Sequence, residues 1–470
     1  MVFNSLEFLI FFIIFFLLWP IVRKRNTSRW LFITTASAIF YAWWDWRFLF
    51  LILFSGLIDY ISGILLIKNQ KGKKIILGFS LLANLGSLSI FKYSVFFSTI
   101  IQDVLKIINI EIDLIDRIPD FALILPVGIS FYTFQSLSYT IDIYRGRLQP
   151  TKNILHFFSY LAMFPQLVAG PIIRASDFLH QLKTYRIVSD IEKWNAIKLI
   201  CFGLFQKVVI ADNLSFFIDS SFENKSVYDG TLYWWIVSIA FSFQIYNDFS
   251  GYSLIARGIA KLMGFHFKMN FNHPYLANSL RQFWTRWHIS LSTWFRDYIY
   301  IPMGGSYKGV YRAFFALVVT MLLSGLWHGA NYTFIVWASL HIVFLYFERL
   351  TNWPNKLKKF TPFIIVIIFI QVTIAWVYFR AENLEQANMI IGKLFIFKKS
   401  NLNFFNTYYN NIFFLYLGIL IEVSIYLRKR YLPILNFYMH YNLDVISVSV
   451  SIIMILFFRG EGQQFIYFQF

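Results

Sequence analysis

Two histidines, His288 and His328, are the residues of this sequence best placed to do chemistry. His328 closes an apolar run over residues 313–327, and the sequence GAN separates it from a second apolar run. We therefore expect His328 to lie at membrane depth, at a break between two hydrophobic helices. Burial disfavours a charged imidazole, so the sequence predicts a neutral histidine that can accept a proton as a general base.

The surroundings of each histidine suggest how it is positioned. Next to His328, Gly329 leaves room for another backbone or a substrate, and Asn331 supplies a carboxamide. On a helical wheel over residues 281–297, the polar side chains fall within about 80° of one another: they are Arg281, Thr285, His288, Ser292 and Arg296. Tryptophans gather on the adjacent face, so we expect one amphipathic helix at a membrane interface. Its histidine then faces protein or a wet cavity, or simply snorkels as part of an interfacial anchor.

Other candidate sites are weaker. We expect His341 to bond a neighbouring carbonyl, and the single cysteine, Cys201, to be a small buried hydrophobe that forms no internal disulfide. Ser290 falls on the far side of the wheel from His288. The sequence has no HExxH, GxSxG or phosphate-loop motif. It therefore predicts neither a metal site nor a covalent nucleophile.

The composition indicates what holds these residues in place. Of 470 residues, 58% are hydrophobic and only 14% charged, which no soluble core of this length could accommodate. We expect an all-α polytopic membrane protein with about ten to thirteen spans and one domain over residues 1–470. The net charge of +18 sits mostly in short loops, which indicates cytoplasmic loops beside lipid and excludes nucleic acid as a partner. The basic cluster at 23–25 follows the first span, so we predict an external N-terminus and no cleaved signal peptide.

Several spans carry signs of packing inside a bundle. Residues 123–144 contain Pro126, Gly128 and several hydroxyl side chains, which favour contact with protein over lipid. Residues 154–168 form the next predicted span, and AGPIIR after it marks a turn or a broken helix. Lys207, Asp212 and Asp248 interrupt later spans. We expect these charges to face the interior of the bundle.

Long motifs give the sequence a family resemblance. The segments FWTRWHISLSTWFRDYIYIPMGG and LSGLWHGANYTFIVWASLH resemble those of the membrane-bound O-acyltransferases, and within them the bacterial alginate O-acetyltransferase branch. PVGISFYTFQSLSYTIDIYRG, FPQLVAGPIIR, NDFSGYS and the terminal FIYFQF are similar to that branch as well. The resemblance runs from about residue 120 to the end. It implies a ring of transmembrane helices around a thin central region with re-entrant or amphipathic helices, the essential histidine at His328 and a second motif histidine at His288.

The resemblance also implies an activity. An acyl group, most simply acetyl from acetyl-CoA or another cytosolic thioester, passes to a hydroxyl on an extracytoplasmic polysaccharide or on an acetyl-accepting envelope partner. His328 acts as the base, and Asn331 or the indole N–H of Trp327 stabilises the oxyanion, with Arg296 as a further candidate for substrate binding. No bound cofactor is expected, and the expected location is the bacterial cytoplasmic membrane. Two alternatives remain: D-alanyl transfer of the teichoic acid type, and a transporter or flippase.

Overall fold

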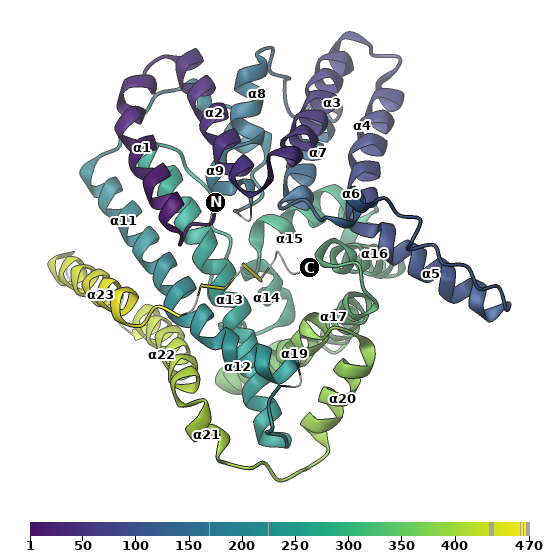
Figure 1. Ribbon diagram of the computed structural model, residues 1–470, viewed down its shortest axis with the longest axis vertical. Helices are drawn as coiled ribbons and strands as arrows, with labels where there is room; N and C mark the ends of the chain where they lie inside the picture. Colours follow the sequence, from purple (N-terminus) through teal and green to yellow (C-terminus); the bar gives the residue numbers. More distant parts are fainter. Residues whose placement is uncertain (169, 224, 432–436, 461, 464, 467–470) are drawn as a thin grey trace. The chain divides into compact units, whose positions relative to one another are not determined.

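The computed structural model describes residues 1–470 except 169, 224, 432–436, 461, 464 and 467–470, so most of the terminal FIYFQF segment lies outside the described residues. For residues 428–431 and 437–442 it describes only the backbone. Every regular element in the described part of the chain is a helix (Figure 1). The predicted all-α class is confirmed.

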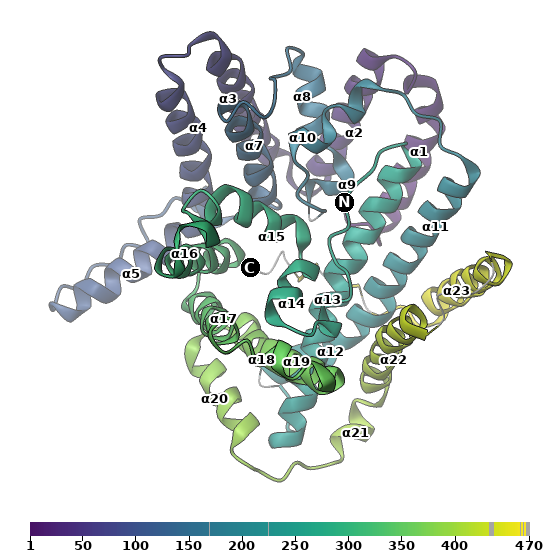
Figure 2. The same ribbon diagram turned by 180° about the vertical axis from the view of Figure 1, so that it is seen from behind.

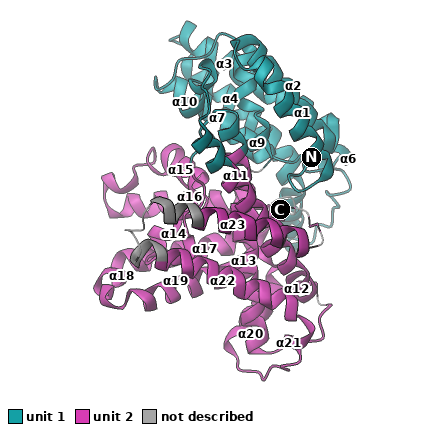
Figure 3. Ribbon diagram, turned by 90° about the vertical axis from the view of Figure 1, so that its left-hand side faces the viewer, with its two compact units in different colours: residues 1–196, 259–268 teal, residues 197–258, 269–470 magenta. Residues whose placement is uncertain are grey.

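The chain divides into two compact units, which are described separately (Figure 3). Unit 1 comprises residues 1–196 and 259–268, and unit 2 comprises residues 197–258 and 269–470. Two helices, α11 (Asp190–Leu204) and α13 (Thr231–Leu262), contribute residues to both units. The prediction of a single domain stays a prediction.

Each unit is built from helices of different lengths. Unit 1 holds α1 (Leu6–Val22), α2 (Asn26–Asp45), α3 (Leu49–Lys68), α4 (Lys73–Leu88), α5 (Ser94–Ile107), α6 (Asp120–Leu123), α7 (Ile129–Tyr144), α8 (Ile154–Leu161), α9 (Phe164–Leu167) and α10 (Ala175–Phe178). Unit 2 holds α12 (Asp212–Phe222), α14 (Leu280–Arg286), α15 (Ile289–Phe295), α16 (Val310–His328), α17 (Tyr332–Thr351), α18 (Trp353–Lys356), α19 (Thr361–Arg380), α20 (Leu384–Phe395), α21 (Phe404–Thr407), α22 (Tyr409–Tyr431) and α23 (Phe437–Phe457).

Many of these helices are suited to a bilayer. Among the described residues, seven helical stretches are long and apolar enough to cross a membrane: 26–68, 73–107, 190–222, 310–328, 332–351, 358–380 and 409–427. Two shorter apolar helices cover 6–22 and 443–457. The protein is therefore a multi-pass membrane protein, as predicted. The count of ten to thirteen spans and their arrangement as a ring stay predictions.

The polar helix α7 lies inside unit 1, beside α3 and α4 (Figure 1). The carboxylate of Asp59 on α3 is fully buried and accepts hydrogen bonds from Ser136 and from Thr140 (2.9 Å) on α7. Ser80 and Asn84 on α4 donate to the same carboxylate. Polar groups in a lipid environment must be satisfied within the protein, so this shared acceptor draws three helices together. The predicted packing of residues 123–144 is confirmed, although the helix begins only after Gly128, whose φ is +75°.

The predicted span 154–168 was wrong in its continuity. The segment forms α8 and α9 with a break at Ala162 and Met163. Pro165 explains the break, because its ring and its missing N–H are tolerated only in the first turn of a helix. It accordingly occupies the first turn of α9. The sequence pattern correctly indicated that residues 154–168 are apolar, but it did not predict the break between α8 and α9.

In unit 2, the directions of the helices define two ends. Helix α16 ends at His328, α17 begins at Tyr332 and packs against it, and α19 packs against α17 (Figure 2). Near His328, Asn331 donates to the carbonyl of Glu382 (2.9 Å), and Arg380 pairs with Asp219 at the end of α12 (2.7 Å). We call this the His328 end. The opposite end, with the loops before α16 and after α17, carries a group of seven basic side chains; these are Arg296, Lys308, Arg312, Arg349, Lys356, Lys358 and Lys359. We call it the basic end.

Candidate functional site

The segment that carries His288 is broken at that residue, and the prediction of one helix over 281–297 is wrong. Helix α14 ends at Arg286, and α15 begins at Ile289. His288 lies between them with φ +40°, the left-handed region that non-glycine residues seldom adopt. The polar side chains and the tryptophans of residues 281–297 therefore do not line two sides of a single helix. His288 itself is 1% exposed, which excludes a snorkelling interfacial anchor.

A second segment holds this break in place. The backbone N–H of Ile289 donates to the carbonyl of Asn270 (2.8 Å), and that of Asn272 donates to the carbonyl of Arg286 (2.9 Å). The side-chain oxygen of Asn270 accepts from both the N–H (3.1 Å) and the hydroxyl (2.9 Å) of Ser290. Asn270 is 1% exposed. Its carboxamide thus accepts a backbone N–H that the helix break releases from helical hydrogen bonding.

His288 has a defined protonation state. Its Nδ1 accepts the backbone N–H of Leu291 (3.2 Å), so the imidazole caps α15. Burial lowers the pKa of His288 to about 3, which keeps the ring neutral at physiological pH. In a neutral ring whose Nδ1 accepts, the proton resides on Nε2. His288 is therefore arranged as a hydrogen-bond donor at Nε2 and not as a base at Nδ1.

His328 occupies the last turn of α16, between the two hydrophobic helices that the sequence predicted. It is 4% exposed and is surrounded by aromatic rings. The centroids of Trp327, Trp337 and Phe379 lie 5.0, 5.3 and 5.2 Å from the imidazole, all edge-on. Such packing fixes the ring orientation and keeps the local environment apolar. The indole of Trp327 also contacts His288 at 6.0 Å, so this one residue bridges the two imidazoles.

Both histidines line one cavity of about 980 Å³ in unit 2. One face of α16 forms its wall, through Leu317, Thr320, Met321, Ser324 and His328. These positions span eleven residues, or about 16 Å at 1.5 Å per residue. The cavity therefore follows α16 from near the basic end to the imidazole of His328.

Four cationic side chains line the same cavity: Arg281, Arg296, Arg349 and Lys358. Arg296 pairs with its neighbour Asp297 (2.7 Å). The carboxylate of Glu348 also lines the cavity, but it accepts the backbone N–H groups of Leu280 (2.6 Å) and Arg281 (3.3 Å) at the start of α14. A carboxylate in that position stabilises the helix N-terminus. The wall of the cavity thus has an excess of positive charge.

The other predicted site residues are divided between the cavity and its support. Arg296 lines the cavity, whereas Asn331 and Trp327 are not among its lining residues. The carboxamide of Asn331 accepts the N–H of Thr333 (3.1 Å), which caps α17, and donates to Glu382. At Gly329 the close neighbour is the ring of Phe334, whose carbon lies 2.0 Å from where a Cβ would stand. Neither Asn331 nor Gly329 therefore lines this cavity.

His341 is buried, but the predicted bond to a carbonyl was wrong. Neither ring nitrogen has a hydrogen-bond partner in the described part of the chain. The imidazole instead packs against Trp284 (4.9 Å) and Trp337 (5.0 Å), and it does not line the cavity. Its role is in the aromatic packing behind His328.

Lys207, Asp212 and Asp248 are buried in unit 2, as their positions in apolar spans predicted, and they form one cluster. The ammonium group of Lys207 pairs with Asp212 (2.7 Å) and Asp248 (2.8 Å). Asp248 also accepts the backbone N–H of Ile466 (2.7 Å), and Lys207 donates to the carbonyl of Gln463 (3.2 Å). The cluster binds the segment after α23 to the helices. Phe249, the residue after Asp248, lies edge-on to His288 at 4.6 Å.

Comparison with known proteins assigns this architecture. The sequence profile of the membrane-bound O-acyltransferase family matches residues 148–390, which include both histidines. The chain belongs to the membrane-bound O-acyltransferase family. A probable alginate O-acetylase of Pseudomonas putida is 38% identical over 405 residues, which cover 84% of this chain and 81% of that protein. The peptidoglycan O-acetyltransferase of Helicobacter pylori is 35% identical over 399 residues, covering 77% and 72%.

A third relative is more distant. The teichoic acid D-alanyltransferase of Streptococcus thermophilus is 26% identical over 246 residues, covering 49% of this chain and 58% of that protein. Membership of the membrane-bound O-acyltransferases makes this chain an acyltransferase and confirms the predicted enzyme class. Asn270, which holds the helix break at His288, falls within the matched region, but sequence reasoning missed it. No spacing rule pairs a residue with a backbone group twenty positions away.

Proposed function

We propose that this membrane-bound O-acyltransferase moves an acetyl group from a cytosolic thioester to a hydroxyl on the outer side of the bacterial cytoplasmic membrane. The supporting observation is the cavity itself. It follows one face of α16 for about 16 Å and has cationic residues in its wall and His328 on its lining. Basic loops favour the cytoplasmic side, so the basic end of unit 2 is the side from which the donor enters. The external N-terminus is part of the same proposal.

The donor is a thioester whose carrier bears phosphate groups, most simply acetyl-CoA. Arg349 and Lys358 contribute cationic side chains to the lining, where they attract phosphate by charge. The thioester arm then extends along α16 toward the imidazole. A neutral hydroxylated face, made by Thr320 and Ser324, lines that path.

His328 is the general base of the proposed reaction. It takes the proton of the acceptor hydroxyl as that oxygen attacks the thioester carbonyl, and the C–S bond then breaks. The proton passes to the departing thiolate, so the imidazole is regenerated. His288 acts as a donor: its Nε2–H stabilises the oxyanion, because its Nδ1 is already used as a helix cap. General-base catalysis contributes roughly 10² to 10⁴ in rate.

The acceptor is a hydroxyl of a cell-envelope polysaccharide, reached directly or through an acetyl-accepting envelope partner. Relatives that match more than three quarters of this chain are named for alginate and peptidoglycan acetylation, whereas the D-alanyl relative matches about half of it. That difference favours acetyl over D-alanyl.

The deciding experiment is the substitution His328→Ala in cells. Surface-polysaccharide acetyl, measured by mass spectrometry, should fall by about two orders of magnitude or more while the amount of inserted protein stays normal. Full acetylation in this variant would reject the proposed role of His328. Radiolabelled acetyl thioester supplied to inside-out vesicles then tests the donor and its side of entry. Transfer from right-side-out vesicles alone would contradict the proposed orientation.

A further inference from the structure

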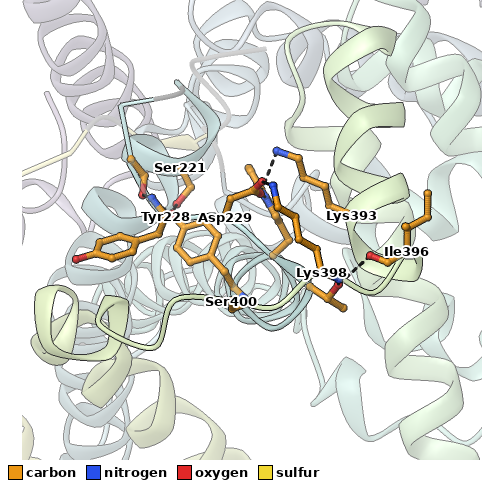
Figure 4. Close-up of polar contacts among 11 residues, drawn as sticks. Ser221, Tyr228, Asp229, Lys393, Ile396, Lys398 and Ser400 are labelled. Atoms are coloured by element: carbon orange, nitrogen blue, oxygen red, sulfur yellow. Dashed lines mark hydrogen bonds and ion pairs between the residues drawn. The ribbon is translucent and has the colours of Figure 1, made fainter.

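The His328 end of unit 2 carries two loops that a charged centre holds together. Asp229, before α13, accepts the ammonium groups of Lys393 (3.0 Å) and Lys398 (2.8 Å) and the indole N–H of Trp234 (2.7 Å) (Figure 4). Partial burial acts to raise the pKa of Asp229, but these donors outweigh it and hold the pKa well below its ordinary value. The carboxylate is therefore ionised at physiological pH.

Backbone hydrogen bonds fix the two loops in register. The N–H of Thr231 donates to the carbonyl of Lys398 (3.0 Å), and the N–H of Lys398 donates to the hydroxyl of Thr231 (3.0 Å). That hydroxyl in turn donates to the carbonyl of Ile396 (3.0 Å), as Figure 4 shows. Gly230 has φ +111°, and a Cβ there would lie 2.5 Å from the hydroxyl oxygen of Ser400. The loop over residues 396–400 is thus held tightly against the start of α13.

Large apolar side chains stand out from this fixed backbone. Phe397 is 87% exposed, Ile396 73% and Phe395 63%, and Val227 on the other loop is 91% exposed. These residues lie beyond the ends of the membrane-crossing helices, where no bilayer-spanning role accounts for them. Exposed apolar groups on a rigid loop mark an interaction surface.

The residues around them indicate the kind of partner. Exposed polar side chains follow the apolar group, namely Lys399, Asn401, Asn403 and Asn406. Carboxamides are unfavourable in acyl chains, so the loop does not fit insertion into lipid. An apolar centre with a polar rim is the anatomy of a protein interface. The segment over residues 395–403 contains two lysines, Lys398 and Lys399, and no acidic residue, so its surface is positively charged.

We propose that the loop formed by residues 395–403 is the docking surface for the envelope protein that accepts the acetyl group, and that this partner presents an apolar pocket bordered by acidic side chains. The inference rests on the proposed function, because it places the acceptor at the end of unit 2 to which α16 delivers His328. Phe397 is the central anchor of the contact.

The first test is the double substitution Ile396→Asp/Phe397→Asp. We expect a loss of surface acetylation of about tenfold or more, as for a buried aromatic anchor. Release of free thiol from the donor thioester by the purified protein should be unchanged, since neither residue lines the cavity. Tyr311→Asp is the matched control, because Tyr311 is 93% exposed but lies at the basic end. Lys399→Glu should weaken acetylation in the same sense by reversing one rim charge.

The second test places a photoreactive amino acid at position 397 in intact cells. Support requires a crosslinked protein that acquires acetyl label only when His328 is intact. Crosslinks to lipid alone, or full acetylation by the double variant, would overturn the docking surface. The two hypotheses fail differently: normal acetylation in His328→Ala rejects the proposed function. Normal acetylation in the loop variant, with His328→Ala inactive, rejects only the docking surface.

Discussion

The indole of Trp337 meets the imidazole of His328 edge-on, with 5.3 Å between ring centroids and 80° between the planes. Trp337 is fully buried and also stacks on Trp376 at 6.0 Å. The indole nitrogen of Trp337 has no hydrogen-bond partner among the described residues, so Trp337 acts on His328 through ring packing. This contact fixes where the imidazole points.

Truncation of that contact should impair catalysis without removing any reacting group. We expect Trp337→Ala to lower kcat by roughly 10²-fold, because a misplacement of about 1 Å has this effect on a positioned catalytic group. Trp337→Phe keeps an aromatic edge and should retain most of the activity. Steady-state kinetics on purified protein check both variants. Equal losses in the two would mean that ring shape is irrelevant.

His288 predicts how stability depends on pH. Its pKa is about 3 in the folded protein, whereas an unfolded chain has about 6.5. Between these values the unfolded state binds a proton that the folded state does not. Stability should therefore fall as pH is lowered from about 6.5 toward 3, with a slope approaching 1.4 kcal/mol per pH unit from this group.

His288→Asn is the variant that isolates this effect. Asparagine caps helices well and tolerates the left-handed backbone, but it does not titrate. Thermal unfolding in detergent, followed from pH 7 to pH 4, should show a shallower decline for the variant than for the natural protein. Parallel curves would contradict a neutral buried imidazole at this position. His288→Ala removes the helix cap as well, which should lower the free energy of unfolding by about 0.5–2 kcal/mol at neutral pH.

Asn270 is predicted to support the site from outside it. Asn270→Ala removes the acceptor of the partly buried N–H of Ser290, which should destabilise the protein by about 1 kcal/mol. Activity should fall as well, because the turn that places His288 loosens. Asn272→Ala is the matched control: its side chain is exposed, and only its backbone takes part in the pairing. The unfolding temperature and kcat of the Asn270→Ala and Asn272→Ala variants would be compared. Similar values in both would show that the Asn270 side chain does not support the site.

The cationic cavity wall predicts a donor-specific defect. Arg349→Gln and Lys358→Gln should each raise the KM for a phosphate-bearing acetyl thioester and leave kcat nearly unchanged, because they act on binding far from the imidazole. Added salt should reduce the difference in KM between each variant and the natural protein, because salt screens the attraction between the cation and the phosphate. Lys356→Gln is the control, since Lys356 is exposed and does not line the cavity. A donor without phosphate should not distinguish these variants.

The sequence predicted features that depend on periodicity and composition. The apolar runs around His328 predicted α16 and α17, and the charges within apolar spans predicted that Lys207, Asp212 and Asp248 are buried. These features follow from solvation, because a lipid environment imposes the same demand on every residue of a span.

Features that depend on a distant partner were not predictable in this way. The helix over 281–297 has good periodicity, yet Asn270 and the cap by His288 divide it. His341 was expected to bond a carbonyl, but it packs against Phe283, Trp284 and Trp337 instead, and only the tertiary structure brings these residues together. A helical wheel treats the chain as isolated, so it cannot anticipate competition from another segment.

Because one face of α16 lines the cavity, the rotation of that helix about its axis decides whether His328 reaches the cavity. Each added residue would rotate everything beyond it by about 100° and advance it by about 1.5 Å. An alanine inserted between Thr320 and Ser324 would therefore turn His328 away from the lining and leave its chemistry intact. Deleting one residue between the insertion and His328 would turn the imidazole back toward the cavity. Comparing the two variants would show whether the direction of the imidazole matters separately from its chemical identity.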